Sequence, residues 1–376
     1  MTSRVFVVNS GSSSIKYQLI DVESERSVAS GLLERVGEPG SDIPDHSAGM
    51  RLILESIPDP SKIVVVGHRV VHGGSVFAQA TLITADVEAK IGALSSLAPL
   101  HNPPNLEGIR AARAALPDIA HVAVFDTAFH QTLAPEAYAY AIDAEIATRY
   151  SVRRYGFHGT SHRFVAEEAA HFLDRPLIEL KLIIFHLGNG ASVCAVDGGR
   201  SVETSMGMTP LEGLVMGTRS GDLDPGALFH LHRESGMGVD ELDDLLNRRS
   251  GLLGLAGRGD MRDVLAAVRA GDAAARLALD VYVHRLRHYL GAYIALLGGV
   301  DAIVFTAGVG ENSAVVRAKA LARLQALGIR LDASLNDSSD RGARRISAED
   351  SAISVLVVPT NEELEIARQS LAVLAR

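Results

Sequence analysis

The sequence has very little cysteine and no long apolar run. Only one of its 376 residues, Cys194, is a cysteine, so an intrachain disulfide is excluded and a reducing compartment is favoured. The longest apolar stretch, around Leu290–Val300, is shorter than the roughly 18 to 20 residues that a membrane-spanning helix needs. The apolar run Val5–Val8 is also too short for the core of a signal peptide. We therefore expect a cytoplasmic protein without a membrane segment.

Positive charge is scarce as well. The chain has 36 Lys and Arg residues against 45 Asp and Glu residues, which gives a formal net charge of −9. This excess of negative charge argues against sequence-independent binding to nucleic acid and against binding to an anionic membrane surface. Any anionic ligand must therefore be held by a few locally placed cations.

The chain length and composition favour a large globular protein. A chain of 376 residues corresponds to about two to two and a half domains on the usual prior. With 47% hydrophobic and 22% charged residues, the composition is neither that of a disordered chain nor that of a fibrous one. One large α/β protein, or two similar halves, is the first expectation.

Three segments share one design, in which a short β-branched run leads into a turn of small residues. They are Arg4–Asp21, Lys181–Val196 and Asp301–Ser313. The second segment ends in a predicted hairpin turn at Asp197-Gly198. The first two lie about half a chain apart, which is typical of two related halves and not of a short-period solenoid. We expect a duplicated α/β domain whose site lies in the cleft between the halves.

Helical patterns fill the intervals between these segments. Asn102 followed by Pro103 predicts an N-cap and a first helical position. The stretch Ala267–Leu296 predicts one long buried helix, and a helical pattern covers Ala314–Leu327. At the C-terminal end, Thr360–Glu363 resembles a capping box before an amphipathic helix. The charge-rich stretches Leu335–Glu349 and Val36–His46 are predicted to be surface loops.

Small residues after the predicted strands are suited to phosphate groups. In Asn9–Lys16, a Gly/Ser turn lets several backbone N–H groups face one anion, with the Lys16 ammonium beside it. Taken alone, such a turn is as often only a turn. His186–Gly190 and Gly308–Asn312 place glycines directly after apolar strands, where a backbone can approach a nucleotide closely. Neither a P-loop string nor the catalytic loop of protein kinases is present.

Charged and polar residues also follow predicted strands. Arg69, Asp126 and His186 come at strand ends, where open α/β sheets gather their ligand groups. A single arginine in such a place is more often a surface or salt-bridge residue. The pair His158 and His162 lacks the Glu of H-E-x-x-H and a nearby Cys or His partner, so a zinc site is disfavoured.

Two further residues have simpler readings. His162 fits a core histidine that donates to a backbone carbonyl equally well. Cys194 lies on a predicted strand with apolar neighbours, which indicates a small buried side chain.

Ten strings along the chain resemble the acetate kinase family, in order and from end to end. They are NSGSSSIKYQLID, GHRVVHGG, APLHNPPNLEGI, VFDTAFHQ, YGFHGTSH, HLGNGASV, TSMGMTPLEGLVMGTRSGDLDPG, DMRD, FTAGVGENS and PTNEELEIAR. The resemblance implies an α/β fold of the actin-like and sugar-kinase superfamily, with duplicated ribonuclease-H-like (actin-like ATPase) domains and an active-site cleft between them. It places residues 1–128 with the C-terminal helix 363–376 in the first domain, and residues 129–362 in the second, nucleotide-binding domain.

The resemblance also implies a reaction. The γ-phosphoryl group of ATP passes in line to acetate, reversibly, giving acetyl phosphate and ADP and feeding acetyl-CoA and acetate metabolism. Mg²⁺ is the implied cofactor, with Mn²⁺ as an alternative, and ATP is the co-substrate. The implied assembly is a homodimer, with no nucleic-acid or membrane partner.

Roles for single residues follow from the motif matches. The implied catalytic residues are Asp126, His158, Arg219 and Arg69, and Arg69 also binds the substrate. The implied pocket for the acetate methyl group consists of Val71, Leu100, Phe157 and Pro210, and the implied magnesium residues are Asn9 and Glu362. The implied phosphate and nucleotide contacts are Ser12, Ser14, Lys16, His186, Leu187, Gly188, Asn189, Gly190, Asp260, Met261, Arg262, Gly308, Val309, Gly310, Glu311 and Asn312.

Elementary chemistry narrows one of these roles. Acetate is already ionised at pH 7, so its attack on phosphorus needs no proton removed. Asp126 is therefore expected to position Arg69, Arg219 or Mg²⁺ and not to act as a general base.

The sequence departs from the family pattern in two places. The segment Ser250–Asp263 is one residue shorter than usual, and Val36–Pro60 is abbreviated. Two other functions stay open: a propionate or butyrate kinase with the same machinery, and an actin-like nucleotide switch that phosphorylates no acid. A switch has no need for a carboxylate pocket, so the combination of Arg69, Phe157, His158 and Arg219 argues against it.

Overall fold

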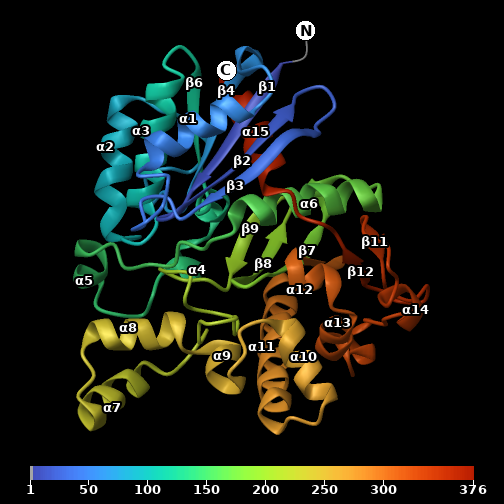
Figure 1. Ribbon diagram of the computed structural model, residues 1–376. Helices are drawn as coiled ribbons and strands as arrows, with labels where there is room; N and C mark the ends of the chain where they lie inside the picture. Colours follow the sequence, from blue (N-terminus) through green and yellow to red (C-terminus); the bar gives the residue numbers. More distant parts are fainter. Residues whose placement is uncertain (1–2) are drawn as a thin grey trace. The chain divides into compact units, whose positions relative to one another are not determined.

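The computed structural model describes residues 3–376, which fall into two compact units (Figure 1). Unit 1 contains the chain up to Gln131 together with Gly159–Ser161 and Asn361–Arg376. Unit 2 contains Thr132–His158 and His162–Thr360. The domain limits implied by the family resemblance remain a prediction. None of the helices in residues 3–376 is long and apolar enough to cross a membrane.

Unit 1 is built on a six-stranded sheet in the order β3-β2-β1-β4-β6-β5. Strands β1, β2 and β3 form an antiparallel meander, β1, β4 and β6 are parallel, and the short β5 pairs antiparallel with β6. The strands are β1 (Arg4–Ser10), β2 (Ser14–Asp21), β3 (Ser27–Glu34), β4 (Ile63–Val70), β5 (Thr81–Leu82) and β6 (Ala120–Phe125). The central strands are rich in valine because both of their faces are covered.

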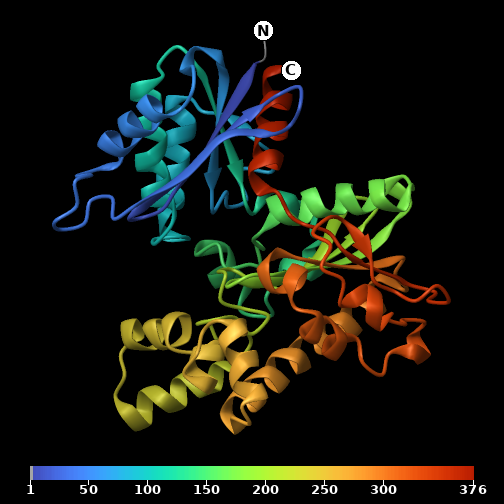
Figure 2. The same ribbon diagram turned by 45° about the vertical axis from the view of Figure 1, so that its right-hand side comes forward.

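Helices cover both faces of this sheet. Figure 2 shows α15 on one face and α1 with α3 on the other. The elements are α1 (His46–Ser56), η1 (Pro60–Lys62), α2 (Ala85–Ala93), η2 (Leu94–Ser96), α3 (Asn102–Ala115), η3 (Ala128–Thr132) and α15 (Glu362–Leu374). The amphipathic helix predicted at the C-terminal end is therefore confirmed, and Asn361 caps it by accepting a hydrogen bond from the Leu364 N–H at 3.0 Å.

Two glycines let helices lie directly on the strands that end at the polar cluster described below. A Cβ added to Gly108 of α3 would lie 2.0 Å from the Ser10 hydroxyl oxygen on β1. A Cβ added to Gly67 of β4 would lie 2.6 Å from the Ser370 hydroxyl oxygen on α15. Both positions therefore require glycine, because any side chain would force the helix off the sheet.

Unit 2 repeats the same sheet. Its strands follow the order β9-β8-β7-β10-β12-β11, with an antiparallel meander, a parallel centre and an antiparallel edge in the same places. The strands are β7 (Lys181–Leu187), β8 (Ala191–Asp197), β9 (Arg200–Thr204), β10 (Ala302–Thr306), β11 (Arg344–Arg345) and β12 (Ser354–Val357). The duplicated α/β fold predicted from the strand-and-turn segments is confirmed.

The helices of unit 2 are more numerous than those of unit 1. Helix α6 lies on one side of the sheet and α11 on the other in both views (Figures 1 and 2). The elements are α4 (Pro135–Tyr138), α5 (Ala144–Arg149), α6 (Gly159–Leu173), η4 (Leu177–Glu179), α7 (Pro225–Ser235), α8 (Val239–Arg248), α9 (Gly251–Ala256), α10 (Met261–Arg269), α11 (Ala273–Leu297), α12 (Ala307–Asn312), α13 (Ala314–Leu321), η5 (Gln325–Leu327) and α14 (Ala333–Asn336).

Two predicted helices are wrong in their limits. The single helix expected over 267–296 is two helices, because Gly271 takes a φ of +89° and Asp272 caps α11. The pattern expected over 314–327 ends as a helix at Leu321, and only the turn η5 follows.

Three local features also differ from the prediction. Asn102 is the first residue of α3 and not its N-cap; its buried side chain instead bridges the backbone N–H and C=O of His72. The hairpin after β8 turns at Gly198-Gly199, both with positive φ, one residue later than predicted. The segment after β10 is the short helix α12 and not an open glycine loop.

Candidate active site

The polar cluster of unit 1 is organised around Arg69 at the end of β4. The Arg69 guanidinium contacts both carboxylate oxygens of Asp126, with Nη2 at 2.5 Å and Nε at 3.1 Å. Its Nη1 lies 3.4 Å from the Asn9 side-chain oxygen. Because β1, β4 and β6 are adjacent parallel strands, the residues near or just after their carboxyl ends meet at one edge of the sheet.

Burial and the neighbouring charges both shift the pKa values of the groups in this cluster. Asp126 is 2% exposed, and burial raises the pKa of its carboxyl, with Arg69 opposing the rise and Glu362 adding to it. Burial likewise raises the pKa of Glu362 at the start of α15. For Arg69, burial lowers the guanidinium pKa, but the carboxylates of Asp126 and Glu362 more than offset this, and the pKa is raised. Arg69 is therefore a permanently charged and already paired cation.

The predicted phosphate turn lies between β1 and β2. The Gly11 N–H donates to the Ser14 carbonyl at 2.8 Å, and the His46 ring contacts the Gly11 carbonyl at 2.9 Å. Ser12 is exposed, and Lys16 forms an ion pair with Glu363 of α15. The turn thus presents a hydroxyl and an ammonium group to solvent on a braced backbone.

The residues implied for the methyl pocket are divided between the units. Val71 is buried and donates its N–H to the Asn105 side-chain oxygen at 3.0 Å, whereas Leu100 is 57% exposed; both lie in unit 1. Phe157 is buried and Pro210 is half-buried in unit 2.

The polar cluster of unit 2 contains three histidines around one serine. The ring of His158 stacks on that of His186, with centroids 4.2 Å apart. The Ser192 hydroxyl oxygen lies 2.9 Å from His158 Nδ1 and 2.8 Å from His162 Nε2. His158 has a φ of +56°, a strained left-handed conformation for a residue with a Cβ. The residues around His158 thus hold its ring in one place.

Arg219 approaches the same cluster from the loop after β9. A Cβ added to Gly190 would lie 3.4 Å from Arg219 Nη1 and 3.6 Å from His158 Nε2, so both nitrogens border the space that this glycine leaves open. Arg219 Nη1 donates to the Pro210 carbonyl at 3.1 Å. Burial lowers the pKa of Arg219, and within residues 3–376 no carboxylate forms an ion pair with it. Its charge is therefore uncompensated.

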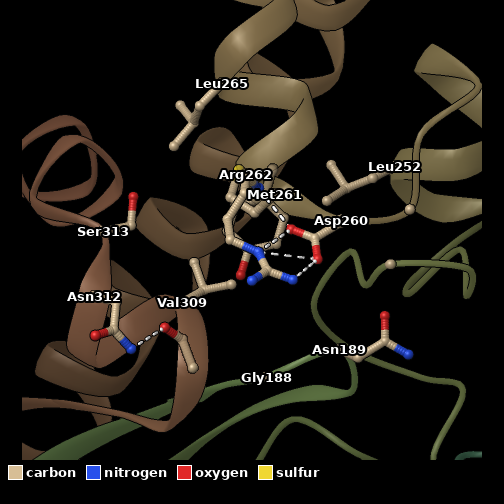
Figure 3. A pocket seen from close by; sticks show the side chains of 14 residues that line it. Gly188, Asn189, Leu252, Asp260, Met261, Arg262, Leu265, Val309, Asn312 and Ser313 are labelled. Carbon is tan, nitrogen blue, oxygen red and sulfur yellow. Dashed lines mark hydrogen bonds and ion pairs between the residues drawn. The ribbon is translucent and has the colours of Figure 1, made fainter.

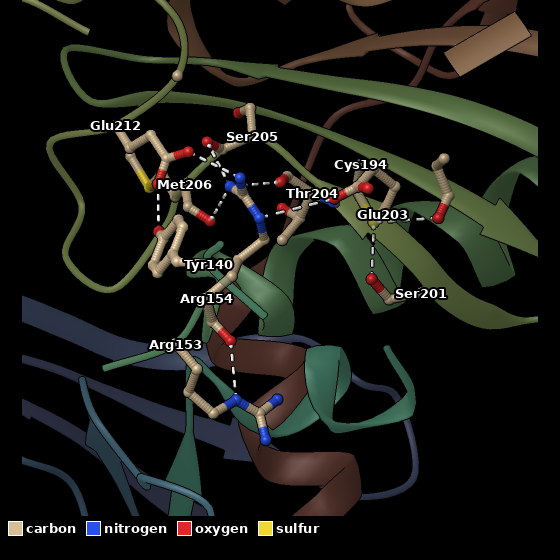
Figure 4. Close-up of polar contacts among 12 residues, drawn as sticks. Tyr140, Arg153, Arg154, Cys194, Ser201, Glu203, Thr204, Ser205, Met206 and Glu212 are labelled. Carbon is tan, nitrogen blue, oxygen red and sulfur yellow. Dashed lines mark hydrogen bonds and ion pairs between the residues drawn. The ribbon is translucent and has the colours of Figure 1, made fainter. Parts of the chain in front are cut away.

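The loop that leads to Arg219 is held by Arg154, which sequence reasoning missed. Figure 4 shows its guanidinium donating to the carbonyls of three consecutive residues, Thr204 to Met206, at 3.1 to 3.2 Å. It also binds Glu212 Oε1 at 2.7 Å, and Tyr140 donates to the other oxygen of Glu212. The only sequence signal is the position of Arg154 directly before YGFHGTSH.

A cavity of about 460 Å³ lies within unit 2 (Figure 3). It is lined by predicted nucleotide residues, namely Gly188, Asn189, Asp260, Met261, Arg262, Gly308, Val309 and Asn312. It is also lined by residues that were not predicted, namely Gly217, Leu252, Gly259, Leu265, Tyr282 and Ser313. The string that contains Gly217, the string FTAGVGENS that ends at Ser313 and the segment Ser250–Asp263 could have identified some of these.

Two features shape this cavity. A Cβ added to Gly217 would lie 2.1 Å from the Asn189 side-chain oxygen, so only glycine fits there. The Arg262 guanidinium folds onto Asp260, with Nη2 2.6 Å from Oδ2, and its hydrogen bonds lower the Asp260 pKa to about 2 (Figure 3). Asp260 is therefore ionised throughout the neutral range.

The other predicted nucleotide residues of unit 2, His186, Leu187, Gly190, Gly310 and Glu311, do not line this cavity. The Glu311 carboxylate accepts from the backbone N–H of Ala307 at 2.8 Å, and Ala307 has a φ of +63°. Arg317 Nη1 donates to the carbonyls of Gly310 and Glu311 at 2.8 and 2.9 Å. Glu311 and Arg317 thus stabilise the short helix α12 after β10.

The residues around Arg69 offer oxygen donors to a magnesium ion. In residues 3–376 there is no cluster of three or more His, Cys, Asp or Glu side chains suited to a metal ion. Mg²⁺, however, is usually held by one or two carboxylates together with water and substrate phosphates. Asn9 contributes an amide oxygen and Glu362 a carboxylate beside Arg69. These hard oxygen donors fit such an ion.

Comparison with known proteins shows similarity over the whole chain. The family model of the Acetokinase family matches residues 4–368. An acetate kinase of Leifsonia xyli is 62% identical, with 99% of each chain covered. The crystal structure of Porphyromonas gingivalis acetate kinase has a TM-score of 0.96 and 40% identity, covering 99% of this chain and 100% of that one. A propionate kinase structure from Francisella tularensis has a TM-score of 0.93 and 39% identity, covering 98% of this chain and 99% of that one.

Proposed function

The chain belongs to the acetokinase family, and we propose that its two polar clusters carry out the phosphoryl transfer of an acetate kinase. It is a kinase with a carboxyl acceptor: the γ-phosphoryl group of ATP passes to acetate, giving acetyl phosphate and ADP, and the reaction is reversible. The observation that carries this proposal is the sequence identity of 52% and 62% with two acetate kinases, which extends over at least 99% of this chain.

The main barrier to this reaction is electrostatic. Acetate is ionised at pH 7, so its carboxylate is already a nucleophile and must be brought against an anionic phosphate. We assign Arg69 to binding the carboxylate or the phosphoryl group. Asp126, which accepts two hydrogen bonds from Arg69, orients that guanidinium and removes no proton from the substrate.

Arg219 and His158 are assigned to the transferring phosphoryl group. The equatorial oxygens of that group carry charge in the transition state, and preorganised donors lower its energy most in a site that excludes water. Arg219 suits this role because its charge is not neutralised by a carboxylate within residues 3–376. His158 adds a ring nitrogen 3.6 Å from the same open position at Gly190.

The cavity of unit 2 is assigned to the nucleoside of ATP. Its apolar side chains, among them Leu252, Leu265 and Val309, suit a planar base, and its glycines allow close backbone approach (Figure 3). Ser12, Ser14 and Lys16 are assigned to the phosphates, and Asn9 and Glu362 would hold Mg²⁺. When bound, the ion neutralises phosphate charge. Mn²⁺ is expected to replace it, since it has similar ligand preferences.

The experiment that tests this proposal also tests the acyl acceptor. Acyl phosphates are trapped as hydroxamates in reactions with ATP and acetate, propionate or butyrate. We assign the acyl group to Val71, Leu100, Phe157 and Pro210, as the family resemblance implies, and a small apolar pocket discriminates by about 1 to 3 kcal/mol per methylene. We therefore expect kcat/KM to fall from acetate to propionate and again to butyrate. Equal values for acetate and butyrate would contradict the pocket assignment, and a maximum at propionate would favour the propionate kinase alternative.

Two further properties are proposed on the family relationship. We expect a homodimer, to be checked by light scattering of the purified protein, and a cytoplasmic location, to be checked by fractionation. A monomeric mass at working concentration would contradict the first. The actin-like switch remains the less favoured function, and it predicts nucleotide binding without any acyl phosphate.

A further inference from the structure

One buried hydroxyl connects two imidazoles in unit 2. Ser192 lies on β8 directly opposite His186 on β7, and it is 0% exposed. Its oxygen lies within hydrogen-bond distance of His158 Nδ1 and of His162 Nε2, at 2.9 and 2.8 Å. His158 is the N-cap of α6, and His162 lies one turn later in the same helix. The strand register and the helical spacing therefore place the three groups in one row.

Proton counting restricts what this row can do. A serine hydroxyl has one proton to donate, and a neutral imidazole has one N–H and one bare nitrogen. If both rings are neutral and both contacts are hydrogen bonds, Ser192 donates to one ring nitrogen and accepts from the other. Only two arrangements satisfy this rule, and in each the tautomer of one histidine fixes that of the other.

The two arrangements differ at the nitrogen that borders the open position beside Gly190. When Ser192 donates to His158 Nδ1, the proton of His158 is on Nε2, where it can be donated to an anion. In the reverse arrangement, His158 Nε2 presents a lone pair, which repels an anionic oxygen. Since Nε2 and Arg219 Nη1 lie 3.6 and 3.4 Å from a Cβ built at Gly190, only the first arrangement gives two donors at this position.

We propose that Ser192 and His162 are positioning residues, which hold His158 as the Nε2–H tautomer through the chain His162 Nε2–H to Ser192 Oγ–H to His158 Nδ1. The proposal rests on the function proposed above, because it makes His158 a neutral donor to the transferring phosphoryl group. Arg219 then supplies the fixed charge, and His158 supplies a directed hydrogen bond.

The surroundings of His158 support a fixed ring. Its left-handed backbone, with a φ of +56°, persists only where neighbouring contacts define the conformation. The His186 ring lies against it at 4.2 Å with an interplanar angle of 23°, which prevents the imidazole from swinging away. The Ser192 hydroxyl fixes the remaining freedom, namely the ring flip and the position of the proton.

The direct test is a measurement of the tautomers in the whole protein. Long-range ¹H–¹⁵N correlation spectra of histidine-labelled protein distinguish a protonated from a bare ring nitrogen. Signals of His158 and His162 are identified by their loss in His158→Gln and His162→Gln. We expect both rings of the wild-type protein to be Nε2–H tautomers. An Nδ1–H tautomer at His158 would overturn the proposal, and this holds whether or not the protein makes acetyl phosphate.

A kinetic test separates positioning from structural support. Ser192→Ala should lower kcat roughly 10- to 100-fold, by analogy with the loss caused by removing an outer hydrogen bond from a metal-binding histidine. The KM for ATP should stay unchanged, and Ser192→Thr, which keeps the hydroxyl, should recover most of kcat. The matched control is Ser205→Ala, which removes another buried hydroxyl of unit 2 that accepts from the Val193 N–H at 3.0 Å and contacts no histidine ring.

Each outcome of the kinetic test has a clear reading. A loss of kcat in Ser192→Ala together with a mixed tautomer signal at His158, while Ser205→Ala keeps its activity, supports the proposal. Unchanged kcat and an unchanged His158 tautomer in Ser192→Ala would contradict it. Equal losses in Ser192→Ala and Ser205→Ala would also contradict it, because they would indicate a general packing effect.

Discussion

The two units carry different chemistry on one topology. The sheets have the same strand order, and the register shift between the second and third strands falls at corresponding positions, between Leu19 and Ile20 in unit 1 and between Ala195 and Val196 in unit 2. The cross-strand pair Asn9 and Lys16 in unit 1 corresponds by register to the pair His186 and Ser192 in unit 2. Equivalent positions thus hold a cation and an amide in one unit and a histidine network in the other.

The central parallel strands show the same contrast. By register, Arg69 at the end of β4 corresponds to Thr306 at the end of β10. Unit 1 therefore places its arginine on the sheet, paired with Asp126, whereas unit 2 brings Arg219 in on a loop held by Arg154. The shared sheet topology therefore sets where the polar side chains lie, while the turns and loops determine which charges they bring.

Arg69 and Arg219 also differ in whether a carboxylate neutralises their charge. A buried ion pair loses much of its stability when one partner is removed, because the other charge is left uncompensated. An unpaired, partly buried cation already carries that cost in the native protein. Substitution of Arg69 should therefore affect stability, and substitution of Arg219 should affect catalysis.

The largest expected effect is on the stability of unit 1. Arg69→Ala leaves Asp126 buried without a partner and should lower the free energy of unfolding by about 3 to 5 kcal/mol. Urea unfolding at pH 7 measures this. The double variant Arg69→Ala/Asp126→Ala should be less destabilised than the single one, because it leaves no unpaired carboxylate. A single variant as stable as the wild type would remove the distinction between the two arginines.

The next effect concerns turnover. Arg219→Ala should lower kcat by roughly 10² or more, as for the loss of one preorganised donor to a developing charge. The urea midpoint should stay unchanged or rise, because the variant removes an uncompensated charge. Steady-state kinetics and unfolding on the same preparation decide this. Near-normal turnover would exclude Arg219 from the mechanism, and a large loss of stability would show that its charge is compensated.

A third effect is confined to the cavity of unit 2. Gly217→Ala would place a methyl group 2.1 Å from the Asn189 side-chain oxygen, a steric conflict worth about 1 to 3 kcal/mol. The KM for ATP should rise while the KM for acetate stays the same. Gly291→Ala is the matched control, since position 291 of α11 is exposed and a Cβ there meets nothing within 4 Å. An increase in the KM for acetate alone would argue against the nucleoside assignment.

The smallest effect is a pH dependence of stability that we assign to a pair of histidines in unit 1. His68 Nε2 and His121 Nδ1 are 2.9 Å apart, and burial lowers the pKa of both rings, most strongly at His68, where the neighbouring His121 adds to the effect. The unfolded chain therefore binds more protons than the folded one below pH 6.5, and stability is lost as the pH falls from 6.5 toward the folded pKa values.

The measurement is the free energy of unfolding between pH 7.5 and 5.5. Each linked histidine should contribute up to about 1.4 kcal/mol per pH unit. His68→Leu/His121→Leu should flatten this slope, whereas His284→Leu, at an exposed position of unit 2, should keep it. A wild-type slope retained in the double variant would show that the pair does not carry the dependence.

Much of this contrast could be predicted from the sequence, because strand-and-turn patterns are local. The β-branched runs and the glycine turns identified β1, β7 and β10 and the residues at their ends. Counting from the turn at Gly188 would also have placed Ser192 opposite His186, since antiparallel register follows from the turn. The motif match to a known family then supplied the reaction.

The parts that were missed depend on distant contacts. Arg154 reaches backbone carbonyls about fifty residues away, and Tyr282 lines the cavity from a helix separated in sequence from its other residues. The predicted helix limits were wrong at Gly271, whose positive φ interrupts the helical pattern. The predicted N-cap was wrong at Asn102, because its side chain binds the His72 backbone and does not cap its own helix. Intrinsic helix propensity cannot predict these features, because tertiary packing determines them.

The proposed phosphoryl transfer is tested by the ratio of acetyl phosphate to ADP formed in one reaction that contains ATP, Mg²⁺ and acetate. ADP and acetyl phosphate are measured in the same samples over the initial phase, with the wild-type protein and with Arg219→Ala. We expect one acetyl phosphate for each ADP in the wild type and a loss of both products in the variant. ADP formed without acetyl phosphate, or nucleotide bound without turnover, would contradict it.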